Sequence, residues 1–182
     1  NTNSQIIFYN SFSGNLQTSI ITGKLSFASN SSQNIDLSDK LTIANLFSNN
    51  NLNINSSIEV TEEINIVNGI IYNNNSFTLN YDTRSNLGAT NFVDGALTIK
   101  TTGSSTKNIF FPIGKGFSYN PITINISPLT SSGITLKAEL FELIPPNPTN
   151  ISSELTSIYT EKYWNIENVN GNSFSATNSI QL

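Results

Sequence analysis

Short runs of alternating apolar and polar residues occur along most of the chain, and no long stretch repeats apolar residues at the helical spacing i, i+3, i+4, i+7. Clear examples are residues 77–81, 122–126 and 134–140, and clusters of Asn, Ser and Gly separate such runs. Alternation with period two among β-branched and aromatic residues is typical of strands that bury one face. The pattern therefore predicts an all-β chain.

The predicted strands between residues 24 and 81 are very short and lie close together in the sequence. Apolar pairs recur there roughly every ten to twelve residues, which is the spacing of solenoid turns or tight meanders. Asn-rich connectors at 48–51, 55–57 and 73–75 join them. Asn tolerates turn conformations, and its amide can bond to an Asn in the next turn. We therefore expect residues 1–90 to form a short β-solenoid or β-helix-like region.

Residues 91–182 contain longer predicted strands and clearer turn signals, such as Asp94-Gly95 and Asn170-Gly171. About six or seven strands with such punctuation predict an antiparallel β-sandwich. The polar segment 82–91 lacks alternation, so we place a domain boundary there. The last predicted strand ends at Leu182 without a turn or tail, so we expect the sandwich to be truncated at its C-terminal end.

Composition restricts the chemistry that is open to the chain. Its 182 residues include no Cys, His or Met, only 11% are charged, and the net charge is −4. The missing Cys excludes disulfides and thiol chemistry, and the missing His removes the commonest general base and metal ligand. Sparse, scattered Lys and Arg predict no nucleic-acid binding, and no apolar run predicts direct membrane insertion. Because Asn1 is no natural start, we expect a segment of a longer protein.

The polar residues are mostly Asn, Ser and Thr, and Asn alone accounts for roughly 30 positions, far above its usual share. A composition of this kind is most often only a choice of surface residue. The functional alternative is a flat Asn and Thr face that binds a sugar or a crystal surface.

The carboxylates show no arrangement that predicts catalysis. Glu62 and Glu63 are adjacent, so regular strand pleating would place them on opposite faces, where they cannot act as an acid–base pair. We therefore predict that the chain is not an enzyme. The alternative hypothesis is a β-helix lyase or glycosidase.

No cofactor is predicted, and calcium is the only metal considered. No calcium-binding loop motif occurs. The remaining candidate ligands are two pairs of carboxylates, Asp36 with Asp39 and Asp82 with Asp94.

Several motifs follow one another in a definite order over residues 20–182. They are Gly-Lys-Leu-Ser-Phe at 23–27, Lys-Leu-Thr-Ile-Ala-Asn at 40–45, the aliphatic run at 58–71, Phe-Val-Asp-Gly-Ala-Leu at 92–97, Phe-Phe-Pro-Ile-Gly at 110–114, Tyr-Asn-Pro-Ile-Thr-Ile at 119–124 and Tyr-Trp-Asn-Ile at 163–166. The ordered set resembles a repeat cassette of large Bacteroidota cell-surface proteins, many of them adhesin-like and used in gliding motility. The resemblance implies secretion by the type IX secretion system and no catalytic residues.

On this resemblance we expect a non-catalytic structural or adhesive module of a large secreted protein, which mediates attachment or display at the bacterial surface. Its location would be extracellular, attached to the outer membrane. Its partners would be a surface glycan, another extracellular surface, or the secretion and motility machinery. The ligand, the number of repeats and the oligomeric state do not follow from the sequence.

The alternative from another class is a carbohydrate-binding module of an extracellular polysaccharide-degrading enzyme. Such a module would present an exposed row of aromatic rings, for which Tyr119, Tyr159 and Tyr163 are the candidates. The adhesive hypothesis instead expects these rings to be buried. Alternation also predicts that one of Phe110 and Phe111 faces the core and the other faces away.

Overall fold

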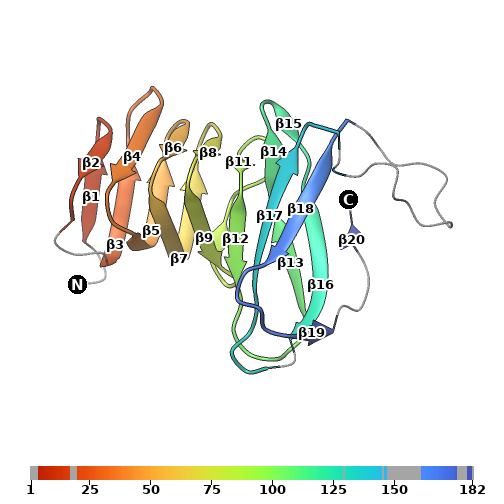
Figure 1. The fold of residues 1–182 in the computed structure, drawn as a ribbon. Coiled ribbons are helices and arrows are strands. Elements are labelled where there is room, and N and C mark those ends of the chain that lie inside the picture. The colour runs from red at the N-terminus through yellow and green to blue at the C-terminus, as the bar shows by residue number, and fades with distance from the viewer. Residues whose placement is uncertain are drawn as a thin grey trace.

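The protein was analysed as a computed structural model, which describes residues 4–16, 20–128, 130–144, 146, 161–175 and 180–181. All the regular elements in these residues are β-strands, so the all-β prediction is confirmed (Figure 1). None of the described residues belongs to a helix that is long and apolar enough to cross a membrane.

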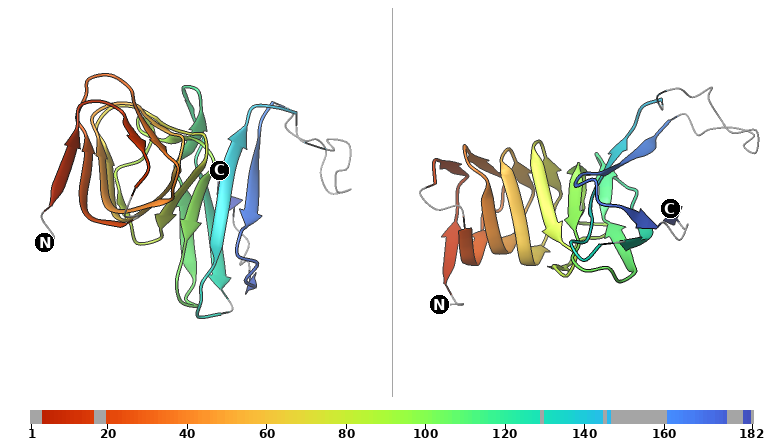
Figure 2. Two further views of the ribbon diagram at one scale, coloured as in Figure 1. Left: turned by 60° about the vertical axis from the view of Figure 1, so that its left-hand side comes forward. Right: turned by 60° about the horizontal axis from the view of Figure 1, so that its bottom comes forward.

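Two parallel sheets face each other along most of the molecule (Figures 1 and 2). The first sheet contains, in order, β1 (Gln5–Phe8), β3 (Ile20–Phe27), β5 (Leu41–Ser48), β7 (Ser57–Ile66), β9 (Ser76–Asn80) and β12 (Leu97–Lys100). The second sheet contains β2 (Phe12–Gly14), β4 (Gln33–Leu37), β6 (Leu52–Ile54), β8 (Ile71–Asn73), β11 (Val93–Gly95) and β14 (Ile113–Lys115). Because the chain alternates between the sheets, it winds into a solenoid of about six turns.

The winding explains the spacing of the apolar residues. Each turn contributes one strand to each sheet, so the recurrence of roughly ten to twelve residues corresponds to half a turn. Leu52 pairs with Ile71 one turn later, and Gln33 pairs with Leu52. The predicted solenoid is therefore confirmed. The expectation of very short strands was wrong for the first sheet, where β3 and β5 have 8 residues each and β7 has 10, because β7 continues through two apolar runs.

Side chains from both sheets fill the space between them. Strand β4 shows the alternation most clearly, with Gln33, Ile35 and Leu37 buried and the two residues between them exposed. Inward side chains also stack along the solenoid axis, because parallel register places like residues in line. Leu25, Leu46 and Ile64 form one such row and are at most 1% exposed. Burying each of these side chains contributes about 1.5–3 kcal/mol.

Asparagines in and beside the second sheet connect successive turns through their side chains. The Nδ2 of Asn53 donates to Oδ1 of Asn34 at 2.7 Å, and Asn74 donates to Asn55 in the same way at 3.0 Å. The predicted bonding between asparagines of adjacent turns is present at these positions. It adds side-chain hydrogen bonds to the backbone pairing that holds the turns together.

The solenoid sheets continue across residues 82–91. Strand β9 pairs with β12 and β8 pairs with β11, in both cases parallel, on either side of this segment. Within the segment, β10 (Arg84–Ser85) pairs with β7. The division into domains at residues 90 and 91 stays a prediction, whereas the hydrogen-bonded sheets run past it.

Antiparallel strands follow the last solenoid turns. Strand β17 (Thr135–Phe141) joins the first sheet next to β12, β18 (Tyr163–Asn168) joins β17, and β15 (Ser118–Tyr119) joins β14 at the end of the second sheet. A third sheet contains β13 (Lys107–Phe111), β16 (Ile122–Pro128), β19 (Phe174–Ser175) and β20 (Ile180–Gln181). The strands after β12 are thus partly an extension of the solenoid sheets, and a β-sandwich in this region stays a prediction.

Candidate binding surface

The tyrosines predicted as a ligand surface lie against other aromatic rings. Tyr119 is half-buried, with its ring centroid 5.7 Å from that of Phe92, and burial raises the pKa of its hydroxyl. Tyr163 is half-buried and stacks on Phe141 at 5.2 Å with an interplanar angle of 15°. Tyr159 lies outside the described residues. Each of the two described rings is therefore partly covered by a neighbouring aromatic ring.

The carboxylates considered for calcium are dispersed. Asp36 is exposed on β4, Asp39 accepts a hydrogen bond from the adjacent Ser38 hydroxyl, and Asp82 is exposed in the turn after β9. Within the part of the chain that the structure describes, no three His, Cys, Asp or Glu side chains gather in a way that could hold a metal ion.

Asp94 has a structural role that the sequence does not reveal. Its Oδ1 pairs with Nζ of Lys115 at 2.8 Å, and its Oδ2 accepts a hydrogen bond from the backbone N–H of Gly116 at 2.9 Å. The contacts reach the last residue of β14 and the turn that follows it. Asp94 therefore anchors the hairpin of β14 and β15 to the neighbouring strand β11.

Glu62 and Glu63 are not separated by the strand as regular pleating predicts. The pairing of β5 with β7 shifts register between Ile43 and Asn45, so that β7 contains an extra residue. Glu63 pairs with Asn45 in register, and the Asn45 side chain also donates to Glu62 at 3.5 Å. Both carboxylates therefore lie on the solvent side. The prediction that they point to opposite faces was wrong because the bulge interrupts the alternation.

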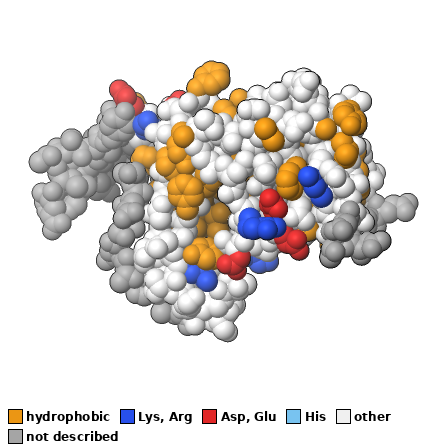
Figure 3. Space-filling model, turned by 180° about the vertical axis from the view of Figure 1, so that it is seen from behind, with side chains coloured by type: hydrophobic (Ala, Val, Ile, Leu, Met, Phe, Trp, Pro, Cys, Tyr) orange, Lys and Arg blue, Asp and Glu red, His pale blue; other side chains and the backbone are white. Residues whose placement is uncertain are grey.

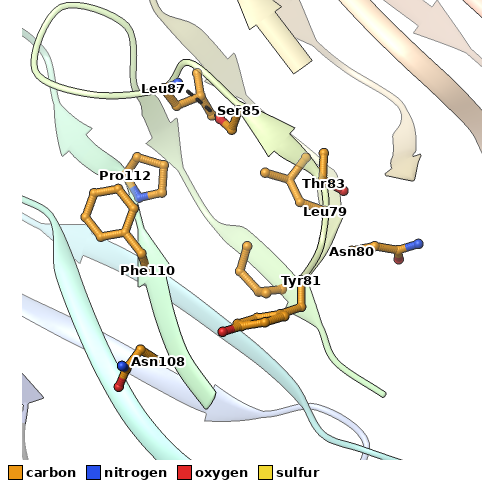
Figure 4. Close-up of a pocket in the computed structure, with 10 residues that line it drawn as sticks. Leu79, Asn80, Tyr81, Thr83, Ser85, Leu87, Asn108, Phe110 and Pro112 are labelled. Carbon is orange, nitrogen blue, oxygen red and sulfur yellow. Dashed lines mark hydrogen bonds between the residues drawn. The ribbon is translucent and has the colours of Figure 1, made fainter. Parts of the chain in front are cut away.

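A hollow of about 370 Å³ opens where the solenoid meets the third sheet. We call it the junction groove. One wall comes from the end of β9, the turn that follows it and β10, and the other wall comes from β13 and the residue after it (Figure 4). The lining residues are Leu79, Asn80, Tyr81, Thr83, Ser85, Leu87, Ile99, Asn108, Phe110 and Pro112.

Two aromatic rings stand on opposite walls of the junction groove (Figure 4). Phe110 is 46% exposed, while the adjacent Phe111 is fully buried, which confirms that the pair faces both ways. On the other wall, Tyr81 is half-buried and its ring lies 4.7 Å from Nζ of Lys107. Pro112 continues the apolar surface beyond Phe110.

Several polar side chains of the junction groove are already hydrogen-bonded to other parts of the chain. Thr83 donates to the carbonyl of Val60 at 3.2 Å, and Ser85 accepts from the backbone N–H of Leu87. The Oδ1 of Asn108 accepts a hydrogen bond from Asn125.

By contrast, some donors of the junction groove make no hydrogen bond to other described residues. Among them are the amide nitrogen of Asn108 and the hydroxyl of Tyr81. In Figure 4 the Tyr81 hydroxyl projects from its wall toward β13, whereas the Asn80 amide points away from Phe110. The junction groove thus offers an aromatic face and two donors that are available to a ligand.

A second, smaller hollow of about 190 Å³ lies on the outer face of the first sheet near its N-terminal end. It includes Ile7 and Tyr9, which are 47% and 69% exposed, and the ring of Phe47. The Nζ of Lys24 stands 3.7 Å above the Phe47 ring and covers that face. The junction groove is therefore the better candidate, because its Phe110 ring has no such cover among the described residues.

Side chains on the reverse face of the molecule form two kinds of surface. Figure 3 shows hydrophobic side chains gathered in a band near the middle of this face, beside a group of oppositely charged side chains. Among the described residues, opposite charges pair at the surface between Glu63 and Arg84, at 3.0 Å, and between Lys137 and Glu167. Opposite charges that meet in this way leave little net charge to attract a charged partner.

Sequence reasoning missed the junction groove because its walls are about 30 residues apart in the chain. The alternation at Phe110 and Phe111 did show that one ring faces outward, but no local signal shows that Tyr81 lies opposite. Comparison with protein-family models, with curated proteins and with solved structures finds no match to this chain. The candidate site therefore depends on its own geometry and chemistry.

Proposed function

We propose that the chain is a non-catalytic structural and adhesive module of a large secreted protein, which mediates attachment or display at the bacterial surface. The observation that carries this proposal is the continuous solenoid of about six turns with one shared apolar core. Each added turn lengthens such a structure by about 4.8 Å, so a solenoid suits a stalk that extends or displays a surface.

The hydrogen bonds between turns support a mechanical role. Along the solenoid, backbone pairing from β1 to β12 is supplemented by side-chain bonds such as those between asparagines of adjacent turns. A chain that is held at many points along one axis resists local separation better than one with a few contacts. This property is what a stalk or display surface requires.

The arrangement of charges supports a non-catalytic role. Glu59 lies between Lys40 and Lys100, with its carboxylate 3.6 Å from the Lys100 ammonium and closer still to that of Lys40. Glu63 pairs with Arg84, and Asp94 pairs with Lys115. Against the opposing effect of burial, Lys40 and Lys100 lower the pKa of Glu59, whereas a general acid needs a carboxyl that stays protonated.

The ordered sequence motifs support a more specific form of the proposal. Through their resemblance to Bacteroidota surface cassettes, we propose export by the type IX secretion system, attachment to the outer membrane and a role in gliding. We also include a C-terminal β-sandwich. The burial of alternate residues in β17, which places Leu136, Ala138 and Leu140 in the shared core, supports it.

A retention assay tests the adhesive function. The chain would be displayed at equal density on a non-adherent host cell, and retention under flow would be measured on bare glass and on polysaccharide-coated glass. We expect more cells to be retained than with the display anchor alone. Equal retention on every surface would contradict the adhesive function, and release of sugar products from the coating would contradict the non-catalytic one.

A second candidate function is a carbohydrate-binding module of a polysaccharide-degrading enzyme. The observation that favours it is the junction groove, whose lining combines an exposed Phe110 with hydroxyl and amide groups. A full-length sequence distinguishes the two functions: an appended catalytic domain favours the binding module, and tandem copies with a sorting domain favour the adhesin.

A further inference from the structure

We propose that the junction groove binds a neutral sugar ring, with Phe110 as the surface on which the sugar stacks. The inference rests on the adhesive function proposed above and deepens it by naming the class of ligand. It assigns the ligand to a different place from the tyrosines predicted from the sequence.

Phe110 offers the stacking surface. Its ring is 46% exposed and stands on the wall of the junction groove, while its neighbour Phe111 is fixed in the core. Aromatic rings carry negative charge on their faces, so they attract the slightly positive C–H groups of a sugar face while excluding water from it. An exposed aromatic ring inside a hollow, rather than on a convex surface, is the arrangement that such stacking requires.

Hydrogen-bonding groups surround this ring. The Asn108 amide nitrogen lies on the same wall, and the Tyr81 hydroxyl projects from the opposite wall (Figure 4). Sugar hydroxyls both donate and accept, so an amide N–H and a phenol O–H are suitable partners. An apolar lining with a few placed polar groups is typical of small-molecule sites.

The lining also argues for a ligand without charge. None of the ten lining residues is charged. The nearest cation, Lys107, lies over the Tyr81 ring and donates to Ser105 at 3.4 Å, and Arg84 is paired with Glu63. A bound carboxylate or phosphate would therefore lose its water in a lining that supplies no charge of its own, with Lys107 beside the Tyr81 ring as the nearest cation among the described residues, whereas a neutral ligand loses less on leaving water.

The size and stiffness of the junction groove fit a short saccharide. Its volume of about 370 Å³ lies within the ~300–1,000 Å³ that ligand pockets usually occupy. Phe110 is held by the pairing of β13 with β16, and the Tyr81 backbone N–H donates to the Lys100 carbonyl at 2.8 Å. Both walls are thus positioned before a ligand arrives, which reduces the entropy lost on binding.

The test is a titration of the isotopically labelled chain with neutral gluco-, manno- and xylo-oligosaccharides, followed by amide chemical shifts. We expect at least one neutral series to produce saturable shifts that centre on β9, β10 and β13. Uronic-acid oligosaccharides form the acidic arm, in which we expect much weaker binding. Saturable shifts with the acidic arm alone, or no saturable shifts in these strands, would overturn the proposal.

Substitutions identify the stacking ring. Phe110→Ala is expected to weaken binding at least tenfold, and Tyr81→Phe to weaken it by a few-fold because it removes one hydroxyl. The matched control is Phe117→Ala, which removes an aromatic ring that is 98% exposed outside the junction groove, and we expect its affinity to stay within twofold of the wild type. Equal losses for Phe110→Ala and Phe117→Ala would overturn the assignment, provided that both variants retain the wild-type spectrum of folded amide signals.

The same variants separate this inference from the proposed function. If wild-type cells are retained in the flow assay and Phe110→Ala cells are retained equally well on polysaccharide, the junction groove is not the adhesive site, although the adhesive function stands. If wild-type cells are not retained at all, the adhesive function itself fails, whatever the titration shows. Loss of retention on polysaccharide with Phe110→Ala alone supports both.

Discussion

The parallel solenoid and the strands that follow it satisfy the backbone hydrogen bonds of their strands in different ways. In the solenoid, each strand pairs with one from the next turn, about 20 residues away, and side chains of the same kind stack along the axis. After β12, β14 still pairs in parallel with β11, whereas the other strands pair antiparallel and their connections vary in length. The first arrangement repeats and can be extended, whereas the second ends the repeat.

The junction groove lies at the boundary between these two arrangements. Its first wall comes from the solenoid at β9 and β10, and its second wall comes from β13, which belongs to the third sheet. The smaller hollow on the solenoid lies along the first sheet alone, whereas the junction groove has walls from two different sheets. The change from parallel to antiparallel pairing therefore creates the one surface for which we propose a ligand.

The largest effect is expected from removing a core ring on either side of the boundary. Phe77 in β9 and Phe111 in β13 are both fully buried in the shared core. Replacing either with Ala should lower the free energy of unfolding by about 3–5 kcal/mol, because each change leaves a cavity. Phe117→Ala serves as the exposed control, with little expected change.

Thermal unfolding of these two variants, followed by circular dichroism, also shows whether the regions are coupled. We expect a single transition that both substitutions shift to lower temperature, because the core is continuous. Two separate transitions, with each variant shifting only one of them, would contradict this coupling.

A smaller effect is expected at Gly95, at the end of solenoid strand β11. Its φ of 119° is a conformation that other residues rarely adopt, and an added Cβ would lie 2.4 Å from the carbonyl oxygen of Asn73 in the adjacent turn. Gly95→Ala should therefore lower the free energy of unfolding by at least about 1–3 kcal/mol. Gly88→Ala is the control, because a Cβ there meets no atom within 4 Å. Equal effects in chemical denaturation would show that the turns of the solenoid are not tightly spaced.

A further, smaller effect is expected from an asparagine that connects two solenoid turns. Asn86 accepts from the Ile66 N–H at 2.9 Å and donates to the Ile66 carbonyl at 2.8 Å and to Asn65 at 2.9 Å, so it connects adjacent turns. Asn86→Ala should cost about 1–2 kcal/mol. Asn165 in antiparallel strand β18 is exposed, and its side chain makes no hydrogen bond to other described residues, so Asn165→Ala should be nearly neutral. A neutral Asn86→Ala in urea denaturation would argue against side-chain bonding between turns as a source of stability.

The smallest effect is expected from Glu59, whose carboxylate pairs with lysines of other solenoid turns. Burial raises the pKa of Glu59, but the hydrogen bonds and positive charges of Lys40 and Lys100 together lower it below its ordinary value. Because the pKa is lower in the folded state, the stabilisation is present above the pKa of the unfolded chain and is lost as the pH falls through the folded value.

Glu59→Gln should therefore reduce stability by less than about 1 kcal/mol at pH 7. The difference from the wild type should disappear as the pH is lowered below the folded pKa of Glu59. Denaturation curves of both proteins between pH 7 and pH 3 measure it. A difference that does not depend on pH would mean that the carboxylate charge has no part in stability.

Much of the solenoid could be predicted because its signals are local. Alternation within each short strand identifies the inward residues, as in β4, and the Asn-rich connectors indicate the turns. The bulge opposite Ile43 and Asn45 could not be predicted, because an extra residue in one strand becomes visible only when its partner is known. The same limit applies to the pairing direction after β12, since alternation is equal in parallel and antiparallel strands of this length.

The candidate site was harder to predict than the fold. Tyr119 and Tyr163 could be selected from the sequence as possible ligand-binding aromatics, but neighbouring rings partly cover both of them. Tyr81 and Phe110 line one groove only because the chain crosses from the solenoid to the third sheet between them. The spatial proximity of residues far apart in sequence depends on the whole fold, so no local motif predicts it.

Amide hydrogen exchange of the unmodified chain tests the central claim most directly, namely that the solenoid and β13 share one core that fixes both walls of the junction groove. We predict that amides in β5, β7, β9, β12 and β13 are protected to a similar degree, because strands that share one core open together. Strong protection in β5 and β7 with rapid exchange in β12 and β13 would contradict the claim. It would show that the two regions open independently and that the junction groove has no fixed walls.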